Sequence, residues 1–143
     1  MSIAPAPITH CSCGNPRPYA DCCGRFHLGE SADSAQKLMR SRYSAYVLHL
    51  EDYLLATWHP STRPPTLDLA DSESTRWLGL EIRSQQQTAE SARIEFIARY
   101  RIGNGPVQRQ HEISRFQRED GRWYYLDGEF PPPPPPFAQQ RRY

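Results

Sequence analysis

The chain has 143 residues, enough for one ordinary hydrophobic core. Its 17 basic and 16 acidic side chains leave a formal net charge of +1, so no overall field draws it to nucleic acid or to an anionic membrane. No apolar stretch approaches the roughly 18 residues of a membrane helix. Residues 1–10 lack the basic start and apolar run of a secretory signal, so we expect a flexible lead and a cytoplasmic location.

All the cysteines of the chain lie within thirteen residues, as two close pairs. They are Cys11, Cys13, Cys22 and Cys23. Zn²⁺ is the cation that prefers four thiolates in a tetrahedral arrangement. The segment between the pairs, 14–21, contains one glycine and two prolines, which favour the turns needed to bring both pairs onto one ion. The spacing therefore predicts a structural zinc site.

Two other uses of these cysteines compete with a zinc site. A pair of disulfides is disfavoured because neighbouring cysteines are poorly placed to bond each other, and four unligated thiols would be unusual in so polar a segment. The identity of the fourth ligand is open on spacing alone. His27 follows Cys23 by four residues, so three thiolates and one imidazole, with Cys22 or Cys23 free, is the alternative.

Helical periodicity begins after the cysteine segment. Apolar residues recur at steps of three and four between positions 34 and 50, and Asp33 or Ser34 can cap the start. A second short helix is expected over 51–57, before His59 and Pro60 end it. A connector rich in proline and polar residues then covers 60–75.

Beyond the connector the period changes to two, which is typical of half-buried strands. Strands are predicted over 77–83, 92–102, 107–118 and 122–127, with turns at 103–105 and 119–121. The residues expected on the covered face of the first two strands are Leu78, Leu80, Ile82, Ile94, Phe96, Ala98, Tyr100 and Ile102. Two helices followed by a four-stranded antiparallel meander predict an α+β fold.

The chain is therefore divided into three parts. Residues 1–29 hold the flexible lead and the metal motif, 30–130 form the α+β domain, and 131–143 form a proline-rich tail, for which we expect a disordered terminus with polyproline II character.

Two stretches carry a resemblance to known families. The segment CSCGNPRPYADCCG, with His27 close behind, resembles the SEC-C metal-binding motif of the SecA translocase. The segments LMRSRYSAYVLHLEDYLLATWHP, WLGLEI and GRWYYLDG are similar to the YchJ family of bacterial proteins. That resemblance covers roughly 10–129 and implies a cystatin-like, nuclear-transport-factor-2-like cone of helices packed on a curved antiparallel sheet.

The resemblance also bears on the metal ligands. Cys11, Cys13 and Cys22 match the three thiolates of the SEC-C pattern, and Cys23 falls where the translocase motif has its histidine, which favours Cys23 over His27. Some YchJ-like proteins carry a second metal motif at the C-terminus, where this chain has a proline tract.

Four thiolates close the coordination shell of an ion and leave no position for an activated water, so the predicted site is structural. In the translocase the similar motif is an adaptor for protein partners and the ribosome. The YchJ family itself has a largely unassigned role. The resemblance to the translocase motif therefore implies a protein-interaction or adaptor module, with RNA or the ribosome as an alternative partner.

The cone provides a separate hypothesis, because helices packed on a curved sheet enclose a cleft. The cleft candidates are Arg42, Tyr43, Tyr46, His59 and Glu112. The candidate bases for an enzyme are Glu112, Asp52 and His59, with Arg42 holding an anion. We favour a buried pair of Arg42 with Glu112 or Glu81 in an aromatic core. A small-molecule binder or enzyme would instead need an open pocket with Arg42 unpaired at its floor.

Overall fold

The computed structural model describes residues 10–67, 69 and 74–131. The helices are η1 (Tyr19–Asp21), α1 (Cys23–His27), α2 (Ala35–Leu48) and α3 (Glu51–Ala56). The strands are β1 (Thr75–Gln87), β2 (Ser91–Ile102), β3 (Val107–Glu119) and β4 (Arg122–Glu129). The predicted lead up to residue 9, most of the proline-rich tail and part of the connector lie outside the described residues.

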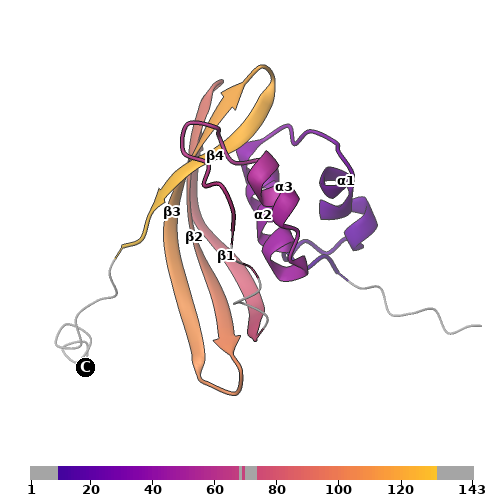
Figure 1. The fold of residues 1–143 in the computed structure, drawn as a ribbon, viewed down its shortest axis with the longest axis vertical. Helices are drawn as coiled ribbons and strands as arrows, with labels where there is room; N and C mark the ends of the chain where they lie inside the picture. The colour runs from indigo at the N-terminus through magenta and orange to yellow at the C-terminus, as the bar shows by residue number, and fades with distance from the viewer. Residues whose placement is uncertain (1–9, 68, 70–73, 132–143) are drawn as a thin grey trace, which may run out of the picture.

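The four strands form one antiparallel sheet in the order β1-β2-β3-β4. Figure 1 shows α1, α2 and α3 on the same side of this sheet, with α2 and α3 between the sheet and α1. The α+β meander predicted from the change of period is therefore confirmed. The short helices η1 and α1 within the cysteine segment were not predicted, because neither is long enough to show a periodic pattern.

Helix α2 begins where the sequence indicates. The Ser34 side chain accepts a hydrogen bond from the Lys37 backbone N–H at 3.2 Å and so caps one of the unpaired donors of the first turn. The helix ends at Leu48, two residues before the predicted end. His49 adopts a left-handed conformation with φ 60°, and Leu50 is already the residue before α3.

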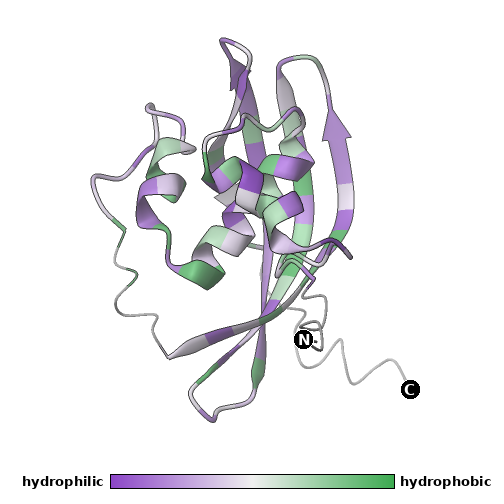
Figure 2. Cartoon of the chain, turned by 90° about the vertical axis from the view of Figure 1, so that its right-hand side faces the viewer, coloured by the Kyte–Doolittle hydropathy of each residue, from purple (hydrophilic) through white to green (hydrophobic). Residues whose placement is uncertain are grey.

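The predicted alternation along β2 is confirmed in its central part. Ile94, Phe96 and Ala98 are buried beneath the helices, whereas Ile102 at the strand end is exposed. Figure 2 shows the corresponding alternation of hydrophobic and hydrophilic residues along the strands behind the helices.

One predicted face assignment in β1 is wrong. The pairing of β1 with β2 shifts register between Trp77 and Gly79, so two residues of β1 take the space of one. Trp77 and Leu80 consequently both pack on the core, and Leu78 between them is 43% exposed. The period of two in the sequence places Leu78 on the same face as Leu80, and it cannot reveal a bulge that arises from the pairing with β2.

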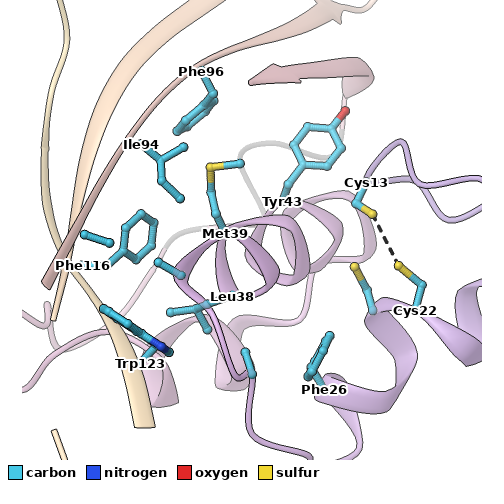
Figure 3. Packing of buried hydrophobic residues seen from close by; sticks show 14 of the residues in the cluster. Cys13, Cys22, Phe26, Leu38, Met39, Tyr43, Ile94, Phe96, Phe116 and Trp123 are labelled. Atoms are coloured by element: carbon cyan, nitrogen blue, oxygen red, sulfur yellow. Dashed lines mark hydrogen bonds between the residues drawn. The ribbon is translucent and has the colours of Figure 1, made fainter. Parts of the chain in front are cut away.

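The cysteine segment and the cone share one hydrophobic core. A single cluster of buried residues contains the four cysteines and Phe26 together with Leu38 and Met39 of α2 and Phe116 and Trp123 of the sheet. In Figure 3, α2 runs between Cys13, Cys22 and Phe26 on one side and Ile94, Phe96 and Phe116 on the other. The cysteine segment is therefore built into the core of the domain.

Within the described part of the chain, the helices are all too short or too polar to cross a membrane.

We predict that Phe26→Ala lowers the stability of the whole domain. Phe26 is 5% exposed, and removing a buried phenyl group costs about 3–5 kcal/mol. Leu28→Ala is the matched control, because Leu28 lies two residues away and is 92% exposed. Chemical denaturation followed by tryptophan fluorescence measures both. If the unfolding midpoint of Phe26→Ala equals that of the unsubstituted protein, the cysteine segment and the cone fold separately, which would contradict the shared core.

Candidate metal centre and cone cavity

The segment before α1 folds back on itself through backbone hydrogen bonds. The Cys11 N–H donates to the Arg17 carbonyl at 2.7 Å, and the Gly14 N–H donates to the Cys11 carbonyl at 3.1 Å. Gly14 has a φ of 100°, a conformation that favours glycine, at the point where the chain turns after Cys13. This turn brings the first pair of cysteines to the second.

The four thiols meet at one point, which we call the cysteine cluster: Cys11, Cys13, Cys22 and Cys23. Their sulfur atoms all lie within 4.8 Å of one another, and the Sγ atoms of Cys13 and Cys22 are 3.6 Å apart. Four sulfurs about 2.3 Å from a tetrahedral zinc would be separated by about 3.8 Å. The cluster therefore fits a metal ion of this kind with small adjustments.

Polar groups next to the cluster are placed to hydrogen-bond the sulfurs. The Asn15 side-chain amide donates to the Cys22 Sγ at 3.5 Å. On α2, the Ser44 Oγ lies 3.5 Å from the Cys11 Sγ. Arg40, also on α2, donates to the Cys13 backbone carbonyl at 2.7 Å and so ties the cysteine segment to the helix without contacting a sulfur. Hydrogen bonds to metal-bound thiolates fix their orientation and disperse their charge.

The thiols strongly influence one another. A hydrogen bond from the Cys23 thiol lowers the pKa of Cys13 to about 5, against the effect of burial. The same hydrogen bond, followed by burial, raises the pKa of Cys23, and burial raises the pKa of Cys22. Four thiolates so close together in a buried site repel one another, so they ionise together only when a cation compensates their charge.

The cluster is closed to solvent. The exposed fraction ranges from 0% for Cys13 to 6% for Cys22. An ion bound by all four sulfurs would have no open position for water or a substrate, which is the arrangement of a structural metal site.

His27 lies outside the cysteine cluster. Its Nδ1 is 2.6 Å from the Tyr19 hydroxyl, its Nε2 is 2.8 Å from the Ser41 carbonyl, and its ring meets Tyr53 edge-on. Both ring nitrogens are therefore engaged in tying η1 and α1 to α2. The desolvated ring has a pKa below its ordinary value.

A second candidate site lies between α2 and the sheet, which enclose a cavity of about 310 Å³. Of the cleft candidates, Arg42, Tyr43, Tyr46 and Glu112 line this cavity. Trp58, Trp77 and Tyr125 form part of the aromatic wall of the cavity. Lining residues that the sequence did not single out for the cleft are Met39, Leu69, Leu80, Phe96, Ala98, Gln110, Ser114, Phe116 and Phe130.

Arg42 is a buried cation that is held mainly by neutral groups. It is 5% exposed, and its Nη1 donates to the Leu54 carbonyl at 2.8 Å and to the Thr57 hydroxyl at 2.7 Å. Its guanidinium carbon lies 5.1 Å from the Trp58 ring and 4.6 Å from the Tyr125 ring. Among the described residues no carboxylate forms an ion pair with it, so the pairing expected with Glu112 or Glu81 is absent. Burial lowers the pKa of Arg42.

Glu112 also lies in this cavity, where neutral donors hold its carboxylate. It accepts hydrogen bonds from the Ser114 hydroxyl at 2.6 Å, the Tyr125 hydroxyl at 2.9 Å and the Gln110 amide at 3.4 Å. Its backbone neighbour His111 faces the opposite side of the sheet and contacts Glu95 at 2.7 Å. His111 and Glu112 therefore point to opposite faces of the sheet, as adjacent residues of a strand do.

The structure leaves several other sequence candidates away from the cavity. His59 contacts Glu119 at 3.0 Å, and Glu81 lies within 3.8 Å of Arg83 and Arg99 outside the cavity. Asp52 is exposed on α3. Two other aromatic residues of the domain also lie away from the cavity: Tyr53 bonds the Ser41 hydroxyl, and Trp123 packs in the core.

The fold and the cluster define a class of protein: a nuclear-transport-factor-2-like α+β domain carrying an N-terminal four-cysteine motif. The family model for the middle NTF2-like domain of YchJ matches residues 34–128. The solution structure of a SEC-C motif containing protein from Rhodopseudomonas palustris has a TM-score of 0.76 and 40% identity, covering 85% of this chain and 98% of that one.

Relatives of nearly the same length agree. UPF0225 proteins from Xanthomonas campestris and Bordetella parapertussis are 54% and 51% identical, covering 85% and 90% of this chain and 95% and 98% of their own. The chain belongs to the YchJ family, whose curated relatives carry the UPF0225 name. A structure from Exiguobacterium sibiricum named for a calcium/calmodulin-dependent kinase II association domain is 12% identical, with a TM-score of 0.52 over 74% of this chain and 99% of that one, and shares the fold alone.

We predict that Gly128→Ala destabilises the cavity wall. An added Cβ would stand 2.8 Å from the Cδ of Glu112, whose carboxylate is buried and held by three donors. Overpacking of this kind costs about 1–3 kcal/mol. Gly79→Ala is the matched control in β1, where the Cβ meets only the flexible end of Arg99. Equal midpoints of thermal unfolding for the two variants would contradict the tight packing of Gly128 on Glu112.

Proposed function

We propose that this protein is a cytoplasmic protein-interaction module in which the cysteine cluster holds one structural Zn²⁺. The supporting observation is the closure of the cluster: four buried sulfurs within 4.8 Å of one another fit an ion and leave it no open position. A reducing compartment keeps such thiols available for metal. When bound, the ion cross-links the segment before α1 to the start of α1.

The surface around the cluster offers a place for a partner. A hollow of about 280 Å³, which we call the basic hollow, is lined by four cationic residues and no acidic ones. The cationic residues are Arg17, Arg25, Lys37 and Arg40. A zinc ion with four thiolates carries about two negative charges, so part of this positive charge balances the metal site itself.

The remaining positive charge is available to a partner. Arg25 and Lys37 are paired with Glu30 at 3.2 Å and Asp33 at 3.0 Å, and Arg40 is bonded to a backbone carbonyl. Arg17 is exposed, and no ion pair to it is formed by the described residues. We therefore propose an acidic segment of a protein as the partner, with RNA or the ribosome as the alternative that the test distinguishes. Phe26 is buried and Tyr19 is bonded to His27, so the aromatic residues of the motif serve packing.

For the metal we predict one zinc per chain bound by all four cysteines. Cys23→Ser removes one sulfur and is expected to lower zinc content well below half an ion per chain, because an incomplete thiolate set binds far more weakly. His27→Gln is the control and is expected to keep the full content, since both imidazole nitrogens are engaged elsewhere. Elemental analysis after reconstitution under reducing conditions measures both. Zinc loss in His27→Gln with retention in Cys23→Ser would contradict the proposed ligand set.

For the partner we predict that Arg17→Glu reduces capture of a bound protein from a lysate of the source bacterium, because the reversed charge repels an acidic segment. Arg109→Glu is the control: it changes the charge equally at an exposed position of β3 outside the basic hollow. The capture is repeated after nuclease treatment. Binding that survives in both variants, or that disappears with nuclease, would overturn the proposal of a protein partner at this hollow.

A further inference from the structure

The cone cavity has the dimensions and walls of a preformed small-molecule site. Its volume of about 310 Å³ stands at the small end of the range of about 300–1,000 Å³ usual for ligand pockets. An engineered apolar cavity of about 150 Å³ accepts benzene, so a single ring with a head group fits here. Most of the wall is apolar or aromatic, and Arg42 and Glu112 are its charged members.

The acceptor at this cavity is already satisfied. Three donors reach the carboxylate of Glu112: the hydroxyls of Ser114 and Tyr125 and the amide of Gln110. A ligand that brought only a further donor, such as an ammonium group, would have to compete with these side chains for the same oxygens.

One of the residues that line this cavity carries a hydrogen-bond donor that no acceptor uses. The Nε1 atom of Trp58 is buried and has no hydrogen-bond partner. Other buried nitrogens of the described residues without a partner belong to Arg25, Arg101 and Trp123, none of which lines this cavity. This nitrogen is closed to water as well as unpaired, so a ligand acceptor reaches it only when the indole ring shifts toward the cavity. Leaving a buried N–H unpaired costs about 1–3 kcal/mol, which favours such a shift when an acceptor is present.

Arg42 adds a fixed cation beside this donor. Its guanidinium lies over the Trp58 ring, and its bonds to Leu54 and Thr57 hold its position without neutralising its charge. A buried cation without an ion-pair partner attracts any oxygen that carries negative or partial negative charge.

We infer that the cone cavity binds a small aromatic molecule that carries an oxygen acceptor, a carboxylate or a neutral carbonyl, directed to Trp58 Nε1 and Arg42. The ring of the ligand packs on the aromatic wall. An amine is disfavoured because Arg42 repels its charge and the carboxylate of Glu112 already accepts three hydrogen bonds. This site is separate from the cysteine cluster and does not depend on the proposed docking role.

The test uses benzoate, benzamide, benzylamine and toluene as probes of matched shape, added to the full chain labelled with ¹⁵N. The chain has three tryptophans, and the indole N–H signal of Trp58 is assigned with the Trp58→Phe variant. Benzoate and benzamide are expected to shift this signal saturably and to leave that of Trp123 in place, because Trp123 does not line the cavity. If the negatively charged benzoate binds more tightly than the neutral benzamide, the charge of Arg42 dominates recognition. If benzamide binds more tightly, the neutral donor of Trp58 dominates.

Trp58→Phe keeps a ring and removes the donor, so it is expected to weaken binding of benzamide about tenfold. In this variant binding is followed through the indole N–H signal of Trp77, which also lines the cavity. Trp123→Phe removes an equally unpaired indole donor outside the cavity and should leave the affinity unchanged. Saturation by benzylamine or toluene as tight as that by benzoate and benzamide would overturn the inference, as would the absence of any shift at millimolar concentrations of all four probes.

Discussion

The structure depends on the packing of α2 between the cysteine cluster and the sheet. One side of this helix presents Ser44 and Arg40 to the cluster, and the other presents Met39 and Arg42 to the cavity. A cation bound by the four sulfurs would therefore also fix the segment against which α2 packs. The stability of the cysteine segment and the shape of the cavity are therefore linked through α2. The same packing explains how a short polar motif is held in a common core with the sheet.

The two sites divide chemical roles between them. At the cluster, buried thiols need a cation to ionise together, and once saturated they leave it no reactive position. At the cavity, the buried Arg42 is surrounded by aromatic rings and neutral acceptors, and Glu112 is surrounded by neutral donors. Both charged groups of the cavity are fixed by the fold before any ligand arrives, so a ligand would bind to groups already in position.

Much of this arrangement follows from local patterns in the sequence. The spacing of the cysteines, the period of α2 with its Ser34 cap, and the alternation along β2 are each set by neighbours within a few residues, so the sequence predicts them. The exposed position of Leu78 could not be predicted, since it comes from a bulge that depends on the register with β2. The position of His59, and the absence of an ion pair to Arg42 within the described residues, likewise depend on contacts between distant segments. His59 reaches Glu119, and Arg42 reaches the end of α3. Sequence periodicity therefore does not predict which charged side chains meet in the folded protein.

The most direct test of the central claim is X-ray absorption at the zinc edge of the reconstituted protein. The account predicts four sulfur scatterers at about 2.3 Å from the ion and no nitrogen or oxygen in the coordination shell. An oxygen or nitrogen neighbour, or a shell with fewer than four sulfurs, would mean that the ion is open to exchange, and the interpretation of a purely structural cross-link would have to be abandoned.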